Sequence, residues 1–356
     1  MQIIDQLAML RDGYDHLYDY RANHRFSPDM KRKSRLLAAF ILCGTGIGYV
    51  YQAVATVQDQ RVLLPPGRML NIDGCRLHVK TGGRGGPAVV LEAGLGGMSS
   101  AWGWIQPEIE KFSRVVSYDR AGLGWSGPDT APKTATMAAR RLRKALFHSH
   151  ILPPYVLVGH SMGGLFTRVF ADLYPDEVGG MVLLDAVHPD QHLRSAAINT
   201  HMRSGFNFLK AVPLLARLGY VRLTGLFNAW TEGLPPRQAA EAEAFLSTYR
   251  HLKTTRDESL AWETICAEVR GTKGLGDTPL VVVTACRAVL PGHPELQKEL
   301  TALSSDSIHF AVKGADHVSL VGRREYAMLV VGAILQVVDK VNALRLGKVL
   351  HNNHTT

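Results

Sequence analysis

The sequence predicts an α/β fold in which a mostly parallel, eight-stranded sheet carries helices on both faces and follows an apolar N-terminal helix. Short apolar runs alternate with helix-like segments along most of the 356 residues, and uninterrupted apolar runs are typical of strands that are covered on both faces. One run ends in Gly159-His160-Ser161-Met162-Gly163 and continues as a helical pattern. The content of 46% hydrophobic and 20% charged residues is that of a globular chain.

The N-terminal region contains a segment, residues 36–57, that has no charged residue. At about 1.5 Å per helical residue this segment can cross a hydrocarbon core about 30 Å thick, so we expect a single-pass transmembrane anchor. Basic residues flank only its N-terminal side and predict a cytoplasmic tail, residues 1–35, with the rest of the chain extracytoplasmic. Two alternatives are a buried core helix and a signal peptide that starts at Met30, is cleaved near residues 53–55 and releases a secreted protein.

After the anchor we expect a linker, residues 58–68, a main domain, residues 69–344, and a flexible tail, residues 345–356. Eight apolar runs predict the strands of the main domain, and Asp73-Gly74 between the first two predicts a hairpin. The runs are residues 69–72, 75–79, 88–92, 114–118, 155–158, 180–184, 279–283 and 308–312. Helical patterns cover residues 134–147, 162–173, 295–303 and 323–343.

About ninety residues between the sixth and seventh strands, roughly 188–277, show no strand pattern. They contain helix-like segments such as residues 237–254. A structureless loop of this length is uncommon inside a compact domain, so we expect a helical cap over one end of the sheet.

Charge and cysteine usage exclude several classes of function. The net charge is +9, but no long basic run lies on a recognisable nucleic-acid module, so we expect no nucleic-acid partner. The four cysteines follow no metal-binding or redox spacing, which predicts no metal and no cofactor. Isolated buried thiols are the expected state, and a Cys266–Cys286 disulfide is the alternative.

Ser161 lies where an apolar strand meets a helix through a sharp turn. This order is typical of a nucleophile elbow, which presents a serine hydroxyl above the end of a sheet. The residues two positions before and after the serine are crowded in such a turn and must be small, and both are glycine here, Gly159 and Gly163. We therefore expect Ser161 to be a catalytic nucleophile.

Four motifs in this order resemble those of the α/β-hydrolase superfamily. They are residues 91–97, residues 117–126, the elbow, and Gly314-Ala315-Asp316-His317. With the anchor, Pro65-Pro66-Gly67 and residues 182–190, the chain resembles membrane-anchored serine hydrolases of undefined substrate. The resemblance covers about residues 65–340 and implies the α/β-hydrolase fold and a small ester or lipid-like substrate.

A serine hydroxyl needs a base to take its proton, and the expected chain order is serine, acid, histidine. The resemblance places the base after the eighth strand, at His317, whereas His160 within the elbow is expected to be a packing or hydrogen-bonding residue. No carboxylate follows the seventh strand in residues 284–290, where the family often has its acid. Asp185 at the end of the sixth strand is the expected acid instead.

The alternatives for the acid are Asp190, Glu295 and Asp306. Asp316 is expected to point away from the histidine beside it, and Asp119 to hold its own loop. For the oxyanion, the resemblance implies two backbone N–H donors, from Met162 after the nucleophile and from Leu95 after the third strand.

The sequence thus predicts a serine hydrolase that cleaves carboxylic esters or related acyl substrates through an acyl-enzyme. A serine nucleophile argues against epoxide hydrolases and haloalkane dehalogenases, which use an aspartate. An acyltransferase, a cofactor-free lyase or peroxidase, and a non-catalytic ligand-binding module on the same fold are the alternatives. The acyl and alcohol groups of the substrate are expected to be set by the cap.

Overall fold

The computed structural model describes residues 28–353, with side chains from residue 44 to residue 347. The chain divides into two compact units, Met1–Tyr51 and Gln52–Thr356. The described part of the first unit is helical and belongs to α2 (Pro28–Val62). Residues 1–27 of the expected cytoplasmic tail, and the side chains of residues 36–43 of the expected anchor, lie outside the described part, so the anchor stays a prediction.

The boundary that we expected between anchor and linker at residue 57 does not coincide with the end of a helix. Helix α2 continues to Val62, and β1 begins at Arg68, so the extended linker is shorter than residues 58–68. Gln58, Gln60 and Arg61 are good helix formers, whereas Pro65 and Pro66 exclude a helix at the following positions.

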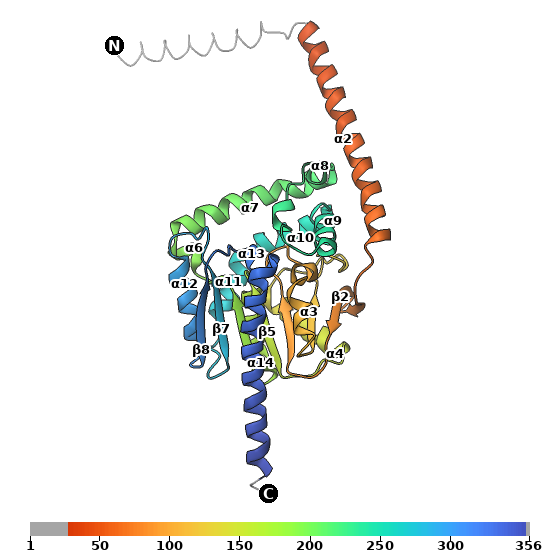
Figure 1. Cartoon of the computed structure of the whole chain (residues 1–356). Coiled ribbons are helices and arrows are strands. Elements are labelled where there is room, and N and C mark those ends of the chain that lie inside the picture. The colour runs from red at the N-terminus through yellow and green to blue at the C-terminus, as the bar shows by residue number, and fades with distance from the viewer. Residues whose placement is uncertain (1–27, 354–356) are drawn as a thin grey trace, which may run out of the picture. The chain divides into compact units, whose positions relative to one another are not determined.

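The second unit is built on one eight-stranded sheet with the order β1-β2-β4-β3-β5-β6-β7-β8 (Figure 1). Strands β1, β2 and β4 pair antiparallel, and the remaining neighbours pair parallel. All eight predicted strands are present, and Ile72 pairs with Cys75 across the predicted hairpin. The strands are β1 (Arg68–Ile72), β2 (Cys75–Gly82), β3 (Ala88–Glu92), β4 (Val115–Tyr118), β5 (Tyr155–His160), β6 (Val178–Leu184), β7 (Leu280–Ala285) and β8 (Ser307–Val312).

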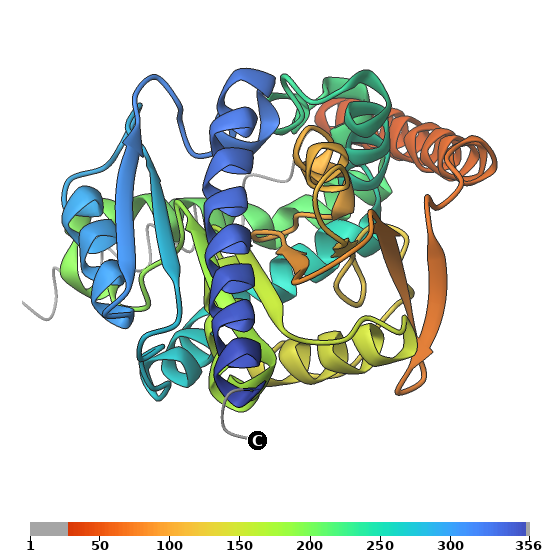
Figure 2. The same ribbon diagram turned by 60° about the horizontal axis from the view of Figure 1, so that its bottom comes forward.

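Helices cover both faces of the sheet, as expected for buried parallel strands. Along β5, Tyr155 and Leu157 pack with α4 (Ala135–His148), α5 (Gly163–Leu173) and α11 (Trp262–Arg270). Val156 and Val158 face the other way, toward α3 (Ile105–Ile109) and α14 (Arg324–Asn353), and Figure 2 shows α14 in front of the strands. The alternation of side chains along a strand thus supplies two cores.

Helix α14 differs from the expectation at its C-terminal end. It continues through residue 353, so residues 345–353 of the expected flexible tail are helical. Leucine, arginine and lysine in this stretch are good helix formers. Within the described residues, Arg324–Gly347 is the one helical stretch long and apolar enough to cross a membrane. One side of it, including Val330, Ile334 and Val337, is buried against the sheet, which is the environment of a core helix.

The predicted cap between β6 and β7 is helical. It comprises α6 (Gln191–Arg194), α7 (Ala196–Arg217), α8 (Tyr220–Thr224), a short 3-10 turn (Asn228–Trp230), α9 (Pro236–Leu246), α10 (Tyr249–Leu260) and α11. The helix expected over residues 237–254 is interrupted, because the Thr248 side chain accepts a hydrogen bond from the His251 backbone N–H and starts α10. After the cap, α12 (His293–Glu299) is followed by a 3-10 turn (Leu300–Leu303) rather than one helix over residues 295–303.

The cysteine expectation is correct in part. Cys75 and Cys266 are buried and free, whereas Cys286 is free and exposed, so the Cys266–Cys286 disulfide is not formed. Cys286 lies immediately after β7, where the chain turns out of the sheet into solvent.

Candidate functional site

Ser161 occupies a strained turn between β5 and α5. Its φ is +55°, in the left-handed region that non-glycine residues seldom adopt. A Cβ on Gly159 would lie 2.7 Å from the Gly164 Cα, and one on Gly163 would lie 2.2 Å from the Glu92 carbonyl oxygen. Both positions therefore require glycine, which is the physical reason for the Gly-x-Ser-x-Gly pattern at this turn.

Ser161, His317 and Asp185 form a continuous hydrogen-bonded chain. The distance from Ser161 Oγ to His317 Nε2 is 2.9 Å, and that from His317 Nδ1 to Asp185 Oδ2 is 2.7 Å. Because a carboxylate can only accept, Nδ1 carries the proton and donates to Asp185. This tautomer leaves Nε2 free to accept from the Ser161 hydroxyl, as removal of its proton requires.

Asp185 is held as a buried anion at the end of β6. Its Oδ1 accepts hydrogen bonds from the Ala285 N–H at 3.0 Å and from His293 Nε2 at 2.8 Å. Burial alone would raise its pKa, but the hydrogen bonds from His293 and His317 outweigh burial and hold the pKa of Asp185 well below its usual range. No sequence pattern indicated His293, which is the first residue of α12 and follows Pro291-Gly292.

The other candidate acids lie elsewhere. Asp190 pairs with Arg270, and Asp306 pairs with Lys340. Glu295 is in the first turn of α12. Asp316 accepts from the Ser319 N–H at 2.9 Å and pairs with Arg287, rather than with the neighbouring histidine.

His160 packs against the His317 ring and bonds to its backbone. The two ring centroids are 4.8 Å apart, and His160 Nε2 donates to the His317 carbonyl oxygen at 2.9 Å. Burial, followed by the nearby His317, lowers the pKa of His160 to about 3. His160 is therefore neutral at physiological pH and adds no positive charge beside the imidazole.

The loop after β3 lies directly over Ser161, because a Cβ on Gly94 would be 2.9 Å from the Ser161 Cβ. Arg120 Nη2 donates to the Gly94 carbonyl oxygen at 2.7 Å. In a planar trans peptide the following N–H, that of Leu95, points in the opposite direction, away from Arg120. Among the described residues, neither the Leu95 nor the Met162 N–H has a hydrogen-bond acceptor, so both donors remain free for a ligand.

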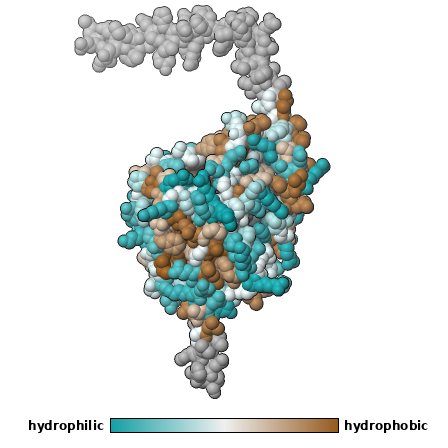
Figure 3. All heavy atoms as spheres, in the orientation of Figure 1, coloured by the Kyte–Doolittle hydropathy of each residue, from teal (hydrophilic) through white to brown (hydrophobic). Residues whose placement is uncertain are grey.

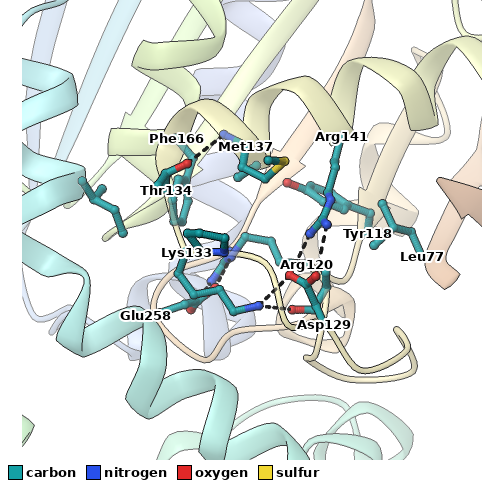
Figure 4. Close-up of a pocket in the computed structure, with 14 residues that line it drawn as sticks. Leu77, Tyr118, Arg120, Asp129, Lys133, Thr134, Met137, Arg141, Phe166 and Glu258 are labelled. Atoms are coloured by element: carbon teal, nitrogen blue, oxygen red, sulfur yellow. Dashed lines mark hydrogen bonds and ion pairs between the residues drawn. The ribbon is translucent and has the colours of Figure 1, made fainter. Parts of the chain in front are cut away.

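Arg120 is a buried cation that ties this loop to the cap. It also donates to the Ala93 carbonyl oxygen at 2.6 Å, to Glu92 at 2.7 Å and to Glu258 at 2.7 and 2.9 Å. Figure 4 shows Arg120 beside Glu258, which projects from α10, at a small cavity of about 40 Å³. In the same view, Asp129 joins Lys133 and Arg141 in a separate ion cluster.

Asp119 holds the loop that follows Arg120. It accepts hydrogen bonds from the Ser99 N–H at 2.7 Å and the Trp125 N–H at 2.9 Å, and its partner on the other side is the buried His78. Burial would raise the pKa of Asp119, but the hydrogen bond and charge of His78 outweigh it and lower this pKa. Its contacts are those of a residue that fixes its own loop.

A cavity of about 820 Å³ opens onto Ser161 and His317 beneath the cap. This volume lies within the range of small-molecule sites, which are mostly apolar with a few polar groups. The lining is mostly apolar, and the cap contributes large apolar side chains to it, among them Phe206, Phe208, Leu226, Phe227, Trp230 and Trp262. Among the described residues, no group of His, Cys, Asp and Glu is arranged to hold a metal ion.

Comparisons with known proteins agree with this fold. A family model described as the alpha/beta hydrolase fold matches residues 87–259. The chain is similar to two uncharacterized proteins of Bacillus subtilis, YqjL (37% identical over 115 residues, 32% of this chain and 46% of YqjL) and YbdG (27% over 190 residues, 52% and 57%). The chain thus spans about half the length of these curated relatives.

Among solved structures, the chain is similar to the Cif epoxide hydrolase from Acinetobacter nosocomialis. The TM-score is 0.66 at 18% identity, over 81% of this chain and 96% of that chain. A likeness at this identity concerns the fold. With its eight-stranded sheet, its elbow and a family match over residues 87–259, the chain has the α/β-hydrolase fold.

Proposed function

We propose that the protein is a serine hydrolase that cleaves carboxylic esters or related acyl compounds. The observation that carries the proposal is the hydrogen-bonded chain from Ser161 through His317 to Asp185. Nucleophile, base and orienting carboxylate stand in the order and at the distances that activation of a serine requires.

In the proposed reaction Ser161 Oγ bonds to the acyl carbon while His317 Nε2 takes the hydroxyl proton. The resulting imidazolium is stabilised by Asp185, and the oxyanion is bound by the Leu95 and Met162 N–H groups. His317 then gives its proton to the leaving alcohol as the carbon–oxygen bond breaks. A water molecule, deprotonated by His317, releases the acid and restores Ser161.

Epoxide hydrolysis is a weaker candidate, although a protein of similar structure is named for it. A serine ester is a suitable intermediate for acyl transfer, because water attacks its carbonyl carbon. Opening an epoxide with Ser161 would instead form an ether, which His317-activated water would not cleave readily. The site chemistry therefore favours acyl substrates.

Labelling with a fluorophosphonate tests the proposal. We expect one adduct on the full chain in detergent, mapped to Ser161 by mass spectrometry, and loss of both adduct and ester turnover in Ser161→Ala. Loss of a nucleophile of this kind lowers kcat by about 10⁶. Ser259→Ala is the control, because Ser259 is buried in α10 and its hydroxyl donates to the Arg256 carbonyl of the same helix. More than a tenth of the turnover in Ser161→Ala would refute the mechanism.

We also propose that residues 36–57 anchor the protein in a membrane with the hydrolase domain on the extracytoplasmic side. The uncharged length and the one-sided basic flank support this placement. A soluble mature protein that begins near Thr56 would instead indicate cleavage of a signal peptide.

A further inference from the structure

The first part of the cap, residues 191–231, carries only positively charged side chains besides its histidines. Between residues 191 and 231 the sequence has no aspartate or glutamate, whereas it has five basic residues, Arg194, Arg203, Lys210, Arg217 and Arg222. Arg203, Lys210 and Arg217 are seven residues apart, which is close to two helical turns, so they form one stripe along α7. All three are exposed, and among the described side chains no carboxylate pairs with them.

Large apolar side chains lie in the same segment and also face solvent. Leu214 is 59% exposed on α7, and Tyr220 and Leu223 on α8 are 51% and 66% exposed. Figure 1 shows α7 and α8 along the outer edge of the cap. We call Arg203, Lys210, Leu214, Arg217, Tyr220 and Leu223 the cap face. Basic and apolar residues together on the exposed side of a helix are typical of elements that lie on anionic membranes.

The cap face adjoins the mouth of the cavity that contains Ser161. Phe208, Leu226 and Trp230 line this cavity, and each of them is also partly exposed to solvent. Apolar residues also gather over α14 in Figure 3, where Leu329 and Leu335 are exposed, but these residues do not line the cavity. The cap face is therefore the apolar surface through which a hydrophobic ligand could enter.

Helix α8 and the end of α9 are attached to the C-terminal end of α2. Gln52 Nε2 donates to the Ser247 carbonyl oxygen at 2.8 Å, and Arg222 Nη2 donates to Asp59 at 2.6 Å. Val54 and Val57, on the α2 turns between these contacts, are exposed. A membrane segment that ends near residue 57 would thus bring α8 to the bilayer surface.

We infer that the cap face rests on an anionic lipid bilayer, and that acyl esters of bilayer lipids enter the cavity past Phe208, Leu226 and Trp230. The identity of the substrate rests on the proposed hydrolase function, whereas the contact with the bilayer does not. A lipid surface fits better than a second copy of the chain. In a two-fold interface the stripe of Arg203, Lys210 and Arg217 would face its own positive charge, whereas anionic headgroups complement it.

The depth of a fluorophore in the bilayer tests whether the cap face contacts the membrane, and this measurement does not depend on enzymatic activity. In this test, Leu223→Cys in a Cys43→Ser/Cys286→Ser background of the full chain carries a polarity-sensitive fluorophore. The labelled protein is reconstituted into phosphatidylcholine vesicles that contain phosphatidylglycerol. We expect a blue-shifted emission that brominated lipids quench. Leu152→Cys in the same background, at a leucine that is 74% exposed in the loop before β5, is the matched control and should stay in water. Equal, unquenched emission from both labels would overturn the inference.

A comparison of two substrates tests the route of entry. Leu223→Glu should lower hydrolysis of a bilayer phospholipid about tenfold or more, because it places a charge where a leucine would be buried, and should leave a soluble short-chain ester within about twofold. Leu152→Glu should change neither rate. Lys210→Gln should lower phospholipid hydrolysis about fivefold on anionic vesicles and little on neutral ones.

Unchanged phospholipid hydrolysis in Leu223→Glu, or an equal loss on both substrates, would overturn the route of entry. No hydrolysis of either substrate by the unmodified chain would reject the hydrolase function and the route that depends on it, while the depth measurement still decides the contact with the bilayer.

Discussion

Arg120→Met tests how the loop over Ser161 is held in place. Arg120 is only 6% exposed, and its guanidinium is the shared partner of Glu92, Glu258 and the Gly94 carbonyl. Methionine has a similar length but neither the charge nor the donors. The variant therefore leaves two carboxylates buried without their counter-ion.

The cost follows from which charges remain. Removing one member of a buried ion pair typically costs about 3–5 kcal/mol, and two carboxylates are affected here. Burial already raises the pKa of Glu92 in the presence of Arg120, so without this cation Glu92 takes up a proton instead of remaining charged. Neutralising one of the two limits the penalty, and we expect the free energy of unfolding to fall by about 3–5 kcal/mol rather than by twice that amount.

The loss should depend on pH with a defined sign. A carboxyl whose folded-state pKa is raised binds more protons when folded than when unfolded, so the stability of the fold decreases as the pH rises through that pKa. The pKa of Glu92 is raised further in Arg120→Met, because the attraction of Arg120 for the carboxylate is lost. The destabilisation should therefore be larger at about pH 8 than at about pH 5.

Urea unfolding monitored by tryptophan fluorescence measures the stability, and turnover of a soluble ester measures the loop. We expect kcat to fall as well, because the Gly94–Leu95 peptide loses the contact that orients it. Arg120→Lys keeps the positive charge but has fewer directed donors, so its stability and kcat should lie between those of the wild type and Arg120→Met. The double variant Arg120→Met/Glu258→Gln should lose less than the sum of the single variants. Wild-type stability and turnover in Arg120→Met, together with strictly additive effects of Arg120→Met and Glu258→Gln, would show that Arg120 does not hold the loop.

Three further outcomes are expected. Asp185→Asn should lower kcat by about 10³ to 10⁴ with the fold intact, because the imidazole beside it loses the required tautomer; near-normal steady-state turnover would remove Asp185 from the acid role. Gly46→Arg should disfavour membrane insertion by about 3 kcal/mol, measured as release by carbonate washing, whereas Gly332→Arg, at an open position on α14, should remain bound. In thiol titration of the native protein Cys286 should react, and Cys266, whose burial raises its pKa to about 12, should react only after unfolding.

The strands and the elbow could be predicted because their signals are local. Each buried strand is an uninterrupted apolar run, and the turn at Ser161 is bounded by glycines whose Cβ atoms would collide with the backbone. The order of the elements along the chain then defines the α/β sheet. Helix ends were less predictable, since α14 continues past residue 343 without any change in composition that would stop it.

Contacts that join distant parts of the chain could not be predicted from local patterns. His293 is 108 residues from Asp185, and Glu258 is 138 residues from Arg120. A histidine at the start of a helix and a glutamate on a cap helix are not distinctive by themselves. The absence of a carboxylate in residues 284–290 was the sequence signal that a different kind of residue follows β7 near Asp185.

The structure explains why a carboxylate at the end of β6 suits this chain. The end of β7 supplies donors, the Ala285 N–H and the His293 ring, and both are directed at Asp185 Oδ1. A second carboxylate at that end would repel Asp185 at close range in a buried site, where like charges are costly. Donors there instead keep Asp185 ionised and leave Oδ2 to His317. The donors at and after the end of β7 therefore complement a carboxylate at the end of β6, which is the arrangement that the proposed role of Asp185 requires.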